Sequence, residues 1–145
     1  MNIPEYHLKI VTETAVPYNE TTPVYSPDDL ARIMIPRMTG YPVEHFDIVL
    51  LNTAHRILGV RNVSIGGLDV SIVEPRAVFQ IACLANAASI IAVHNHPSGA
   101  LAPSTNDIKI TKRLTEAGTL MGIPLLDHLI ITADGYTSLA RQGII

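Results

Sequence analysis

Hydrophobic and polar residues along this chain follow two different spacings. Short segments rich in apolar and β-branched residues, bounded by Gly, Pro, Asn or Asp, predict strands with one or both faces buried. These segments lie at residues 7–12, 45–52, 56–63, 68–72, 89–93, 123–132 and 136–139. The pairs Gly66-Gly67 and Asp134-Gly135 predict turns between neighbouring strands.

Three other segments predict helices. A helix is expected over residues 27–35, because Ser26 can cap its start and Pro36 would end it. A second helix, with apolar residues at helical spacing, begins at Pro75, and a third covers residues 104–121. Helices and strands are mixed along the chain without strict alternation. The pattern therefore predicts an α/β fold, a single domain with a mixed β-sheet flanked by helices.

The length of 145 residues suits one domain with a substantial core. An apolar content of 48% and a charged content of 16% exclude a disordered or fibrous protein. We expect residues 1–25 to form an N-terminal strand and loop that belong to the domain, and residues 26–145 to form its body. No apolar segment is long enough to cross a bilayer and the first residues lack the features of a signal peptide, so a cytoplasmic location is expected.

Charge and cysteine content narrow the possible functions. A net charge of −3 gives no general attraction to nucleic acid. Cys83 is the single cysteine, so the chain has no internal disulfide and no metal site built from several thiolates. Its place in an apolar segment predicts a core residue rather than a catalytic thiol.

Residues 94–107 read His-Asn-His-Pro-Ser-Gly-Ala-Leu-Ala-Pro-Ser-Thr-Asn-Asp and follow the apolar segment 89–93. Side chains two residues apart in an extended backbone point to the same side, so His94 and His96 are expected to converge. The Pro/Gly-rich turn lets the chain fold back, and the next helix then brings Asp107 toward them. Imidazoles and carboxylates are ligands of catalytic zinc sites, which keep one position open for water. The segment therefore predicts a site for one Zn2+ ion.

Such a site predicts hydrolysis, because zinc lowers the pKa of water to about 7 and polarises a carbonyl group. The reaction also needs a carboxylate that moves a proton and a donor for the developing oxyanion. Ser104, at the start of the third helix, is placed to be that donor. The spacing does not select the carboxylate among four candidates near strand ends, which are Glu44, Asp69, Glu74 and Asp127.

Several of these features also have a structural interpretation. Ser104 and Asp107 have the spacing of a capping box. Asp127 and His128 could orient a metal ligand, but a hydrogen-bonded pair at a strand end is favoured. Three basic residues on one face of the third helix are expected to be a solvated surface rather than a phosphate-binding patch. They are Lys109, Lys112 and Arg113.

The pattern H-x-H-x7-S-x2-D resembles the zinc motif of the JAMM (JAB/MPN) metallopeptidase superfamily. The run His-Asn-His-Pro-Ser-Gly, followed by Pro103-Ser104 and Asp107, more closely resembles the RadC branch. Further segments that resemble this branch lie at residues 44–46, 74–79, 84–88, 122–131 and 135–139. The resemblance covers about residues 25–142 and implies a JAB/MPN fold similar to that of cytidine deaminases.

The resemblance also implies a role for each residue of the motif. His94, His96 and Asp107 match the zinc ligands of the superfamily, and Ser104 matches the serine that stabilises the tetrahedral intermediate. Glu44 matches the general acid/base, which selects it from the four carboxylates. The implied function is a zinc-dependent hydrolase that cleaves peptide or isopeptide bonds, with a peptide or protein as substrate.

Two other functions are considered. A DNA-associated factor without peptidase activity would agree with the repair label of the RadC family. Full-length RadC proteins carry a helix-hairpin-helix region before this domain, for which 145 residues leave no room. A non-catalytic MPN-like scaffold is also possible, although such relatives typically lose ligands and none is lost here. The loop of residues 100–102 is less polar than is usual in the family, which affects the expected substrate preference. A zinc deaminase is excluded because the Pro-Cys-x-x-Cys signature is absent.

Overall fold

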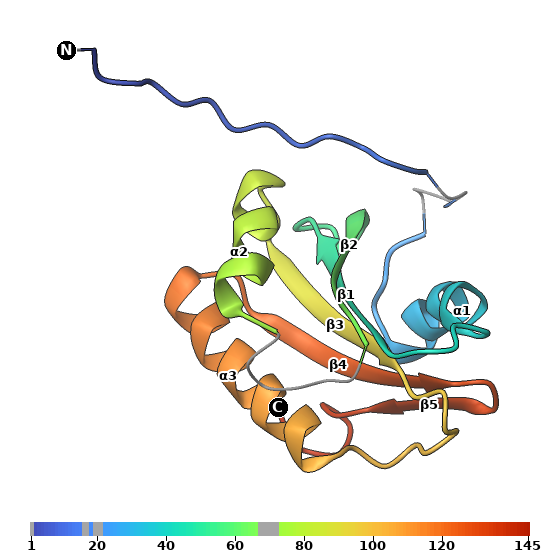
Figure 1. Ribbon diagram of the computed structural model, residues 1–145. Helices are drawn as coiled ribbons and strands as arrows, with labels where there is room; N and C mark the ends of the chain where they lie inside the picture. Colours follow the sequence, from blue (N-terminus) through green and yellow to red (C-terminus); the bar gives the residue numbers. More distant parts are fainter. Residues whose placement is uncertain (1, 16–17, 19–21, 67–72) are drawn as a thin grey trace.

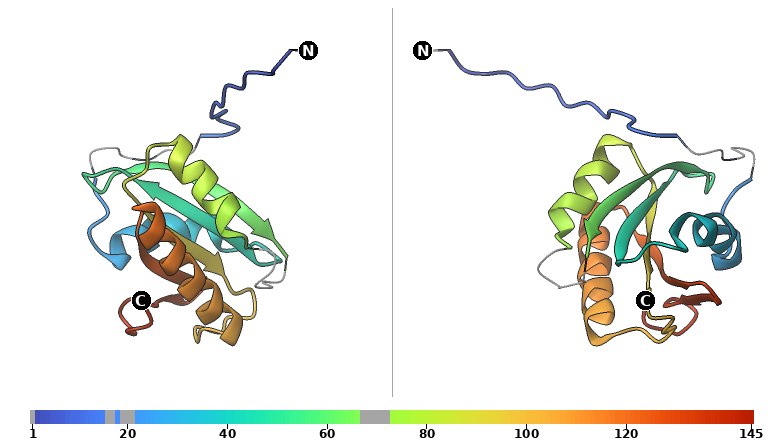
Figure 2. Two further views of the ribbon diagram at one scale, coloured as in Figure 1. Left: turned by 90° about the vertical axis from the view of Figure 1, so that its left-hand side faces the viewer. Right: turned by 45° about the vertical axis from the view of Figure 1, so that its right-hand side comes forward.

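The computed structural model describes residues 2–15, 18, 22–66 and 73–145. A five-stranded sheet has helices on both faces (Figure 1). The strands are β1 (His45–Leu51), β2 (Ile57–Ile65), β3 (Ser89–Asn95), β4 (Leu125–Thr132) and β5 (Gly135–Ser138). The helices are α1 (Pro27–Met38), α2 (Pro75–Leu84) and α3 (Thr105–Met121). Helix α1 covers one face of the sheet, and α2 and α3 cover the other (Figure 2).

The strand order is β2-β1-β3-β4-β5. Strand β1 is antiparallel to both β2 and β3, β3 is parallel to β4, and β4 is antiparallel to β5. The predicted α/β fold with a mixed sheet is therefore confirmed.

Two apolar clusters, one on each face of the sheet, form the core. On the α2/α3 face, Phe46 and Ile48 pack with Leu114 of α3. On the α1 face, Val49 and Leu129 pack with residues of α1. Every residue of β3 is buried, because this central strand is covered on both sides. Alternating side chains of one strand thus enter different clusters, as the two-residue period requires.

Helix α1 extends further than the sequence indicated. We expected Pro36 to end the helix, but Pro36 lies inside it and the last helical residue is Met38. A proline in a helix removes one backbone hydrogen bond. Both Met34 and Met38 are fully buried against the sheet, so apolar packing of the last turn offsets that loss.

Two expectations for the rest of the chain are wrong. Residues 7–12 form no strand; they are exposed and extend away from the sheet (Figure 1). Cys83 is exposed rather than part of the core, because only one side of α2 faces the sheet, the side that carries the buried Val78 and Ala82. The strand expected at residues 68–72 lies outside the described residues. Within the described part of the chain, no helix is long and apolar enough to cross a membrane.

Replacing Gly118 by Ala is expected to destabilise the fold by about 1–3 kcal/mol. Gly118 lies in α3 beside the segment that leads into β4, and a Cβ atom there would lie 2.6 Å from the carbonyl oxygen of Ile123. This clash outweighs the gain of about 1 kcal/mol that Ala brings to a helix interior. Urea unfolding measures the change. The matched control is Leu120→Ala, at an exposed position of the same helix, which should leave the midpoint nearly unchanged. A raised midpoint for Gly118→Ala would contradict the observed packing.

Candidate metal centre

The end of β3 and the first turn of α3 meet at one end of the sheet. His94 lies in β3, His96 directly follows the strand, and Asp107 lies in the first turn of α3. Nε2 of His94 is 2.8 Å from Nε2 of His96 and 3.2 Å from Oδ1 of Asp107. Nε2 of His96 is 3.3 Å from Oδ2 of Asp107. Among the described residues, these three form the one group of His, Cys, Asp or Glu side chains that could hold a metal ion.

The spacing of these atoms fits tetrahedral zinc. Zinc binds histidine nitrogen at about 2.0–2.1 Å, and a tetrahedron of that size separates neighbouring ligand atoms by about 3.3 Å. The three observed separations, 2.8, 3.2 and 3.3 Å, lie close to this value. Two imidazoles and one carboxylate would leave the fourth position open. The predicted triad is therefore brought together in a geometry that can hold one ion.

Asp107 is both a helix-capping residue and a candidate ligand. Its Oδ2 accepts a hydrogen bond of 2.6 Å from the backbone N–H of Ser104, and Oγ of Ser104 accepts one of 3.1 Å from the backbone N–H of Asp107. The capping box is thus complete. Because Oδ1 of Asp107 faces His94, one carboxylate can close the helix end and bind an ion at the same time.

The histidines strongly affect the charge of Asp107. Burial alone would raise the pKa of Asp107, but its interactions with His94 and His96 outweigh burial and hold the pKa well below its ordinary value. The hydrogen bond to Asp107 in turn raises the pKa of His96. The carboxylate is therefore ionised at neutral pH, as a metal ligand must be.

His96 is oriented by the loop that follows it. Its Nδ1 lies 2.6 Å from the carbonyl oxygen of Ala100, and because a carbonyl only accepts, Nδ1 carries the proton. In the neutral ring, Nε2 then presents a lone pair to the triad. The loop is anchored in turn, since Oγ1 of Thr137 in β5 donates a 2.7 Å hydrogen bond to the carbonyl oxygen of Leu101. The loop thus holds His96 through backbone atoms, whatever its side chains are.

Ser104 lies at the rim of the site. It is exposed, and its hydroxyl oxygen accepts the capping hydrogen bond from Asp107. A hydroxyl that accepts a bond still has its own proton to donate. Ser104 can therefore cap α3 and also donate a hydrogen bond to a group bound beside the triad.

Glu44 immediately precedes β1 and lies near His96. In the β1–β3 pairing Phe46 is opposite His94, so the same antiparallel register continued by two residues brings Glu44 opposite His96. The charge of Glu44 contributes to the raised pKa of His96, which agrees with this proximity. The side chain of Glu44 is half-buried.

Asn95 holds the segment around Glu44 next to the end of β3, a role that the sequence did not indicate. Its Oδ1 accepts a 2.7 Å hydrogen bond from the backbone N–H of His45, and its Nδ2 donates a 3.0 Å hydrogen bond to the carbonyl oxygen of Val43. Asn95 thus ties the residues on both sides of Glu44 to the end of β3. The sequence signal was its place between the two histidines, but its partners lie about 50 residues away in the chain and could not be inferred.

The other candidate carboxylates are engaged elsewhere. Asp127 accepts hydrogen bonds from the backbone N–H groups of His128 and Ala140 and from the hydroxyl of Ser138. It therefore holds β4 to the chain after β5, which agrees with a structural role. Glu74 forms an ion pair of 3.3 Å with Arg113. Asp69 lies outside the described residues.

His128 does not share the partners of Asp127; its ring contacts His94 of the triad. It is fully buried, and its ring packs edge-on against Phe46 with ring centroids 5.4 Å apart. Its Nε2 lies 2.7 Å from Nδ1 of His94. Burial holds the pKa of His128 well below its ordinary value, so the ring is neutral.

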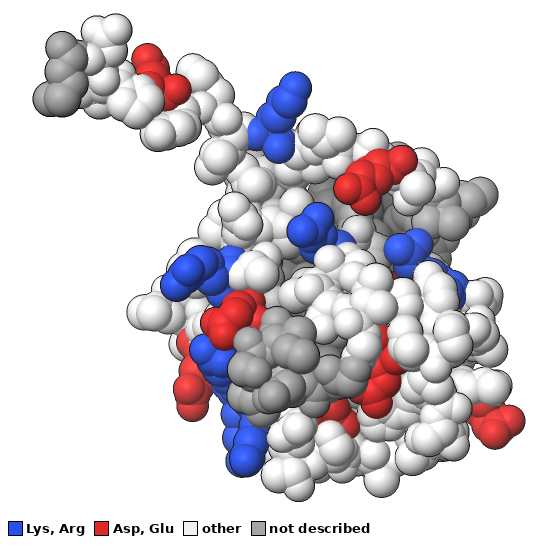
Figure 3. All heavy atoms as spheres, viewed as in Figure 1, with Lys and Arg blue, Asp and Glu red and all other residues white. Residues whose placement is uncertain are grey.

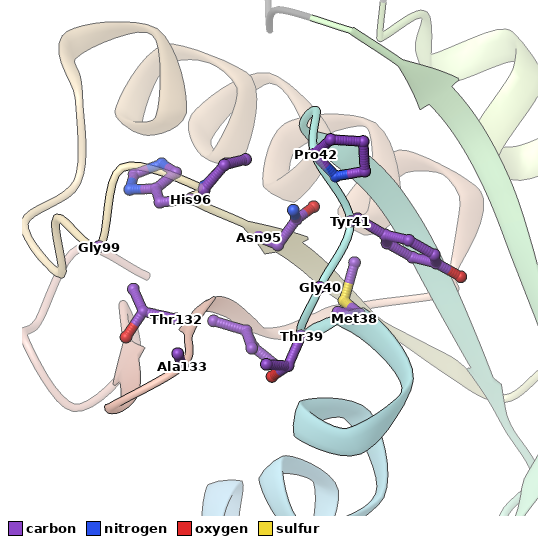
Figure 4. Close-up of a pocket in the computed structure, with 12 residues that line it drawn as sticks. Met38, Thr39, Gly40, Tyr41, Pro42, Asn95, His96, Gly99, Thr132 and Ala133 are labelled. Carbon is purple, nitrogen blue, oxygen red and sulfur yellow. The ribbon is translucent and has the colours of Figure 1, made fainter.

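A groove of about 360 Å³ lies beside His96 (Figure 4). It is bounded by the loop after α1, by the end of β3 with its following turn, and by the end of β4. Figure 4 shows His96 and Asn95 across the groove from the loop that contains Gly40 and Tyr41. Of the triad, His96 alone is among the residues that line this groove.

The surface shows no large region of one charge on the face in Figure 3, where Lys and Arg side chains are interspersed with Asp and Glu side chains. The basic residues of α3 follow this pattern. Lys109 and Lys112 are exposed, and Arg113 pairs with Glu74. This agrees with the expected solvated helix face.

Comparison with known proteins agrees with this fold. The model of the RadC-like JAB domain family matches residues 24–144. A UPF0758 protein of Alkaliphilus metalliredigens is 48% identical over 121 residues, which is 83% of this chain and 52% of that protein. One of Salinibacter ruber is 50% identical over 127 residues, 88% of this chain and 54% of that protein. One of Listeria monocytogenes is 43% identical over 136 residues, 94% of this chain and 58% of that protein.

The chain belongs to the family of RadC-like JAB domains. It spans just over half the length of the curated relatives described above.

Replacing Asn95 by Ala is expected to loosen the segment that carries Glu44. The backbone N–H of His45 and the carbonyl of Val43 would lose their partner, which removes two hydrogen bonds that contribute about 0.5–1.5 kcal/mol each. Amide hydrogen exchange should therefore accelerate at His45. Exchange in β4 serves as the internal control and should change only as far as global stability does. Unchanged exchange at His45 would mean that Asn95 does not hold this segment.

Proposed function

We propose that this chain is a zinc-dependent hydrolase that cleaves peptide or isopeptide bonds in a peptide or protein substrate. The observation that carries the proposal is the convergence of two imidazole nitrogens and a carboxylate within 3.3 Å of one another. Membership of the RadC-like JAB domain family supports the same reaction class, because JAB domains include hydrolases and the zinc motif resembles that of the JAMM metallopeptidases.

His94, His96 and Asp107 would hold the ion. When bound, zinc would supply Lewis acidity, which makes water nucleophilic near neutral pH and polarises the carbonyl under attack. Glu44 takes the proton from the attacking water and later delivers it to the leaving amine. Ser104 donates its hydroxyl proton in a hydrogen bond to the developing oxyanion.

The groove beside His96 is the proposed binding site for the substrate chain. It is lined by backbone-rich turns that include Gly40 and Gly99, and His96 of the triad forms part of its wall. An extended peptide can form hydrogen bonds with such backbone groups independently of its own sequence. The substrate is therefore expected to enter as an extended segment with its scissile carbonyl near His96.

Two alternatives differ in kind from a peptidase. A DNA-associated factor has less support, because Arg113 pairs with Glu74 and the net charge is negative. A non-catalytic scaffold would use the groove to bind a protein without cleaving it. The retained Glu44 and Ser104 favour catalysis over that alternative.

The full chain, purified without chelators, should bind one Zn2+ ion, and His96→Ala should weaken that binding more than about 100-fold. The loss of a direct ligand exceeds the 10- to 100-fold effect of losing an outer hydrogen-bond partner. Competition with a chromophoric chelator measures the affinity. His7→Ala, which removes an exposed histidine far from the triad, is the control and should bind as the wild type does. A wild-type chain that cannot be loaded with zinc would refute the metal site.

Glu44→Gln should bind zinc normally but lose hydrolysis by about 100- to 10,000-fold, because the proton transfer loses its carboxylate. The assay uses the zinc-loaded chain with a set of quenched fluorescent peptides and isopeptide-linked lysine peptides. Glu74→Gln, at the competing carboxylate, should retain activity. If Glu74→Gln is inactive and Glu44→Gln is active, the assignment of the general base is wrong. Tight peptide binding without any cleavage by the wild type would favour the scaffold.

A further inference from the structure

A chain of buried hydrogen bonds leads from His94 away from the triad. Nδ1 of His94 lies 2.7 Å from Nε2 of His128, and Nδ1 of His128 lies 2.6 Å from Oγ1 of Thr111. Oγ1 of Thr111 in turn lies 2.6 Å from the backbone carbonyl oxygen of Asp107. These residues come from β3, β4 and α3, and all four are buried.

The direction of every hydrogen bond in this series follows from its last acceptor, the backbone carbonyl oxygen of Asp107. The carbonyl oxygen of Asp107 only accepts, so Thr111 must donate its single hydroxyl proton to it. Toward His128, Thr111 can then only accept, and Nδ1 of His128 therefore carries a proton. A buried imidazole is neutral, so Nε2 of His128 is an acceptor. The proton between His128 and His94 consequently resides on Nδ1 of His94.

This direction determines which nitrogen of His94 faces the triad as a ligand. With the proton on Nδ1, a neutral His94 has its lone pair on Nε2. That nitrogen is the one that lies 2.8 Å from His96 and 3.2 Å from Asp107. The opposite tautomer would place an N–H group where the ion has to bind.

We propose that Thr111 and His128 are positioning residues that hold His94 in the tautomer able to bind a metal ion. This inference rests on the metal site of the proposed function. Helix α3 carries both the candidate ligand Asp107 and the hydroxyl group of Thr111. These two residues are one turn apart and therefore lie on the same side of the helix. The ligand carboxylate and the group that sets the tautomer of His94 thus move together.

The test compares three variants of the full chain. Thr111→Val keeps the shape of the side chain but removes the hydroxyl, so Nδ1 of His128 loses its acceptor and the opposite tautomer becomes accessible. Thr111→Ser restores the hydroxyl. Thr115→Val is the matched control, because Thr115 makes the same type of bond one turn later, from Oγ1 to the carbonyl oxygen of Thr111. The control removes a helix hydroxyl without touching His128.

Zinc affinity and the protonation of His128 are measured in parallel. Thr111→Val should weaken zinc binding about 10- to 100-fold, as the loss of an outer hydrogen-bond partner does in other metal sites. Thr111→Ser should recover most of the affinity, and Thr115→Val should match the wild type. Ring-nitrogen NMR shifts should place the proton of His128 on Nδ1 in the wild type and move it toward Nε2 in Thr111→Val.

The possible results distinguish failure of the inference about the His94 tautomer from failure of the proposed zinc site. A wild-type His128 protonated on Nε2 overturns the inference, as does a Thr111→Val chain with unchanged zinc affinity and an unchanged His128 tautomer. If Thr111→Val fails to fold, the tautomer of His128 in the wild type decides whether the inference holds. If the wild type binds no zinc, the proposed function fails, while the NMR shifts of the metal-free chain still show whether Thr111 controls His128.

Discussion

The site depends on the complete burial of an imidazole at the end of the central strand. His94 has no exposed surface, because α1 covers one face of β3 and α2 and α3 cover the other. A buried polar ring is costly unless both of its nitrogens find partners. Water cannot provide them here, so the protein must, and the partners come from β4, from α3 and from the turn after β3. The need to satisfy this one ring therefore fixes how α3 and β4 are placed relative to the end of β3.

The pairing of β1 with β3 fixes the position of Glu44, the proposed catalytic carboxylate, relative to the histidines. The antiparallel pairing of β1 with β3 places the start of β1 next to the end of β3, where the histidines are. Asn95 reinforces this junction through the backbone on both sides of Glu44. The proposed proton-transfer group and the candidate ligands thus come from adjacent strands of a sheet whose register is fixed by burial on both faces. A site built on such a frame is expected to change little when an ion binds.

Local patterns in the sequence predicted the parts of the site that depend on nearby residues. The alternation of His94 and His96 and the capping-box spacing of Asp107 are local, and both are found in the structure. The choice of Glu44 needed a family resemblance, since its position depends on strand register over 50 residues. The contact between His128 and Thr111 depends on the packing of α3 against β4, which no spacing reveals. The length of α1 and the exposure of Cys83 were mistaken for the same reason: packing decided them, and not local propensity.

Asp107 closes the capping box of α3 and also faces both histidines, so one carboxylate serves the helix end and the candidate metal site. The capping box fixes the carboxylate before any ion is present, since Oδ2 already accepts the Ser104 N–H. The lone pairs of His94 and His96 are fixed against the same carboxylate by the His128 ring and the Ala100 carbonyl. Three acceptor atoms held this close repel one another unless a positive charge lies between them. The hydrogen bond to Asp107 raises the pKa of His96, so His96 binds a proton more readily here than a free imidazole does. A metal ion at the proposed site would therefore compete with this proton for the same position.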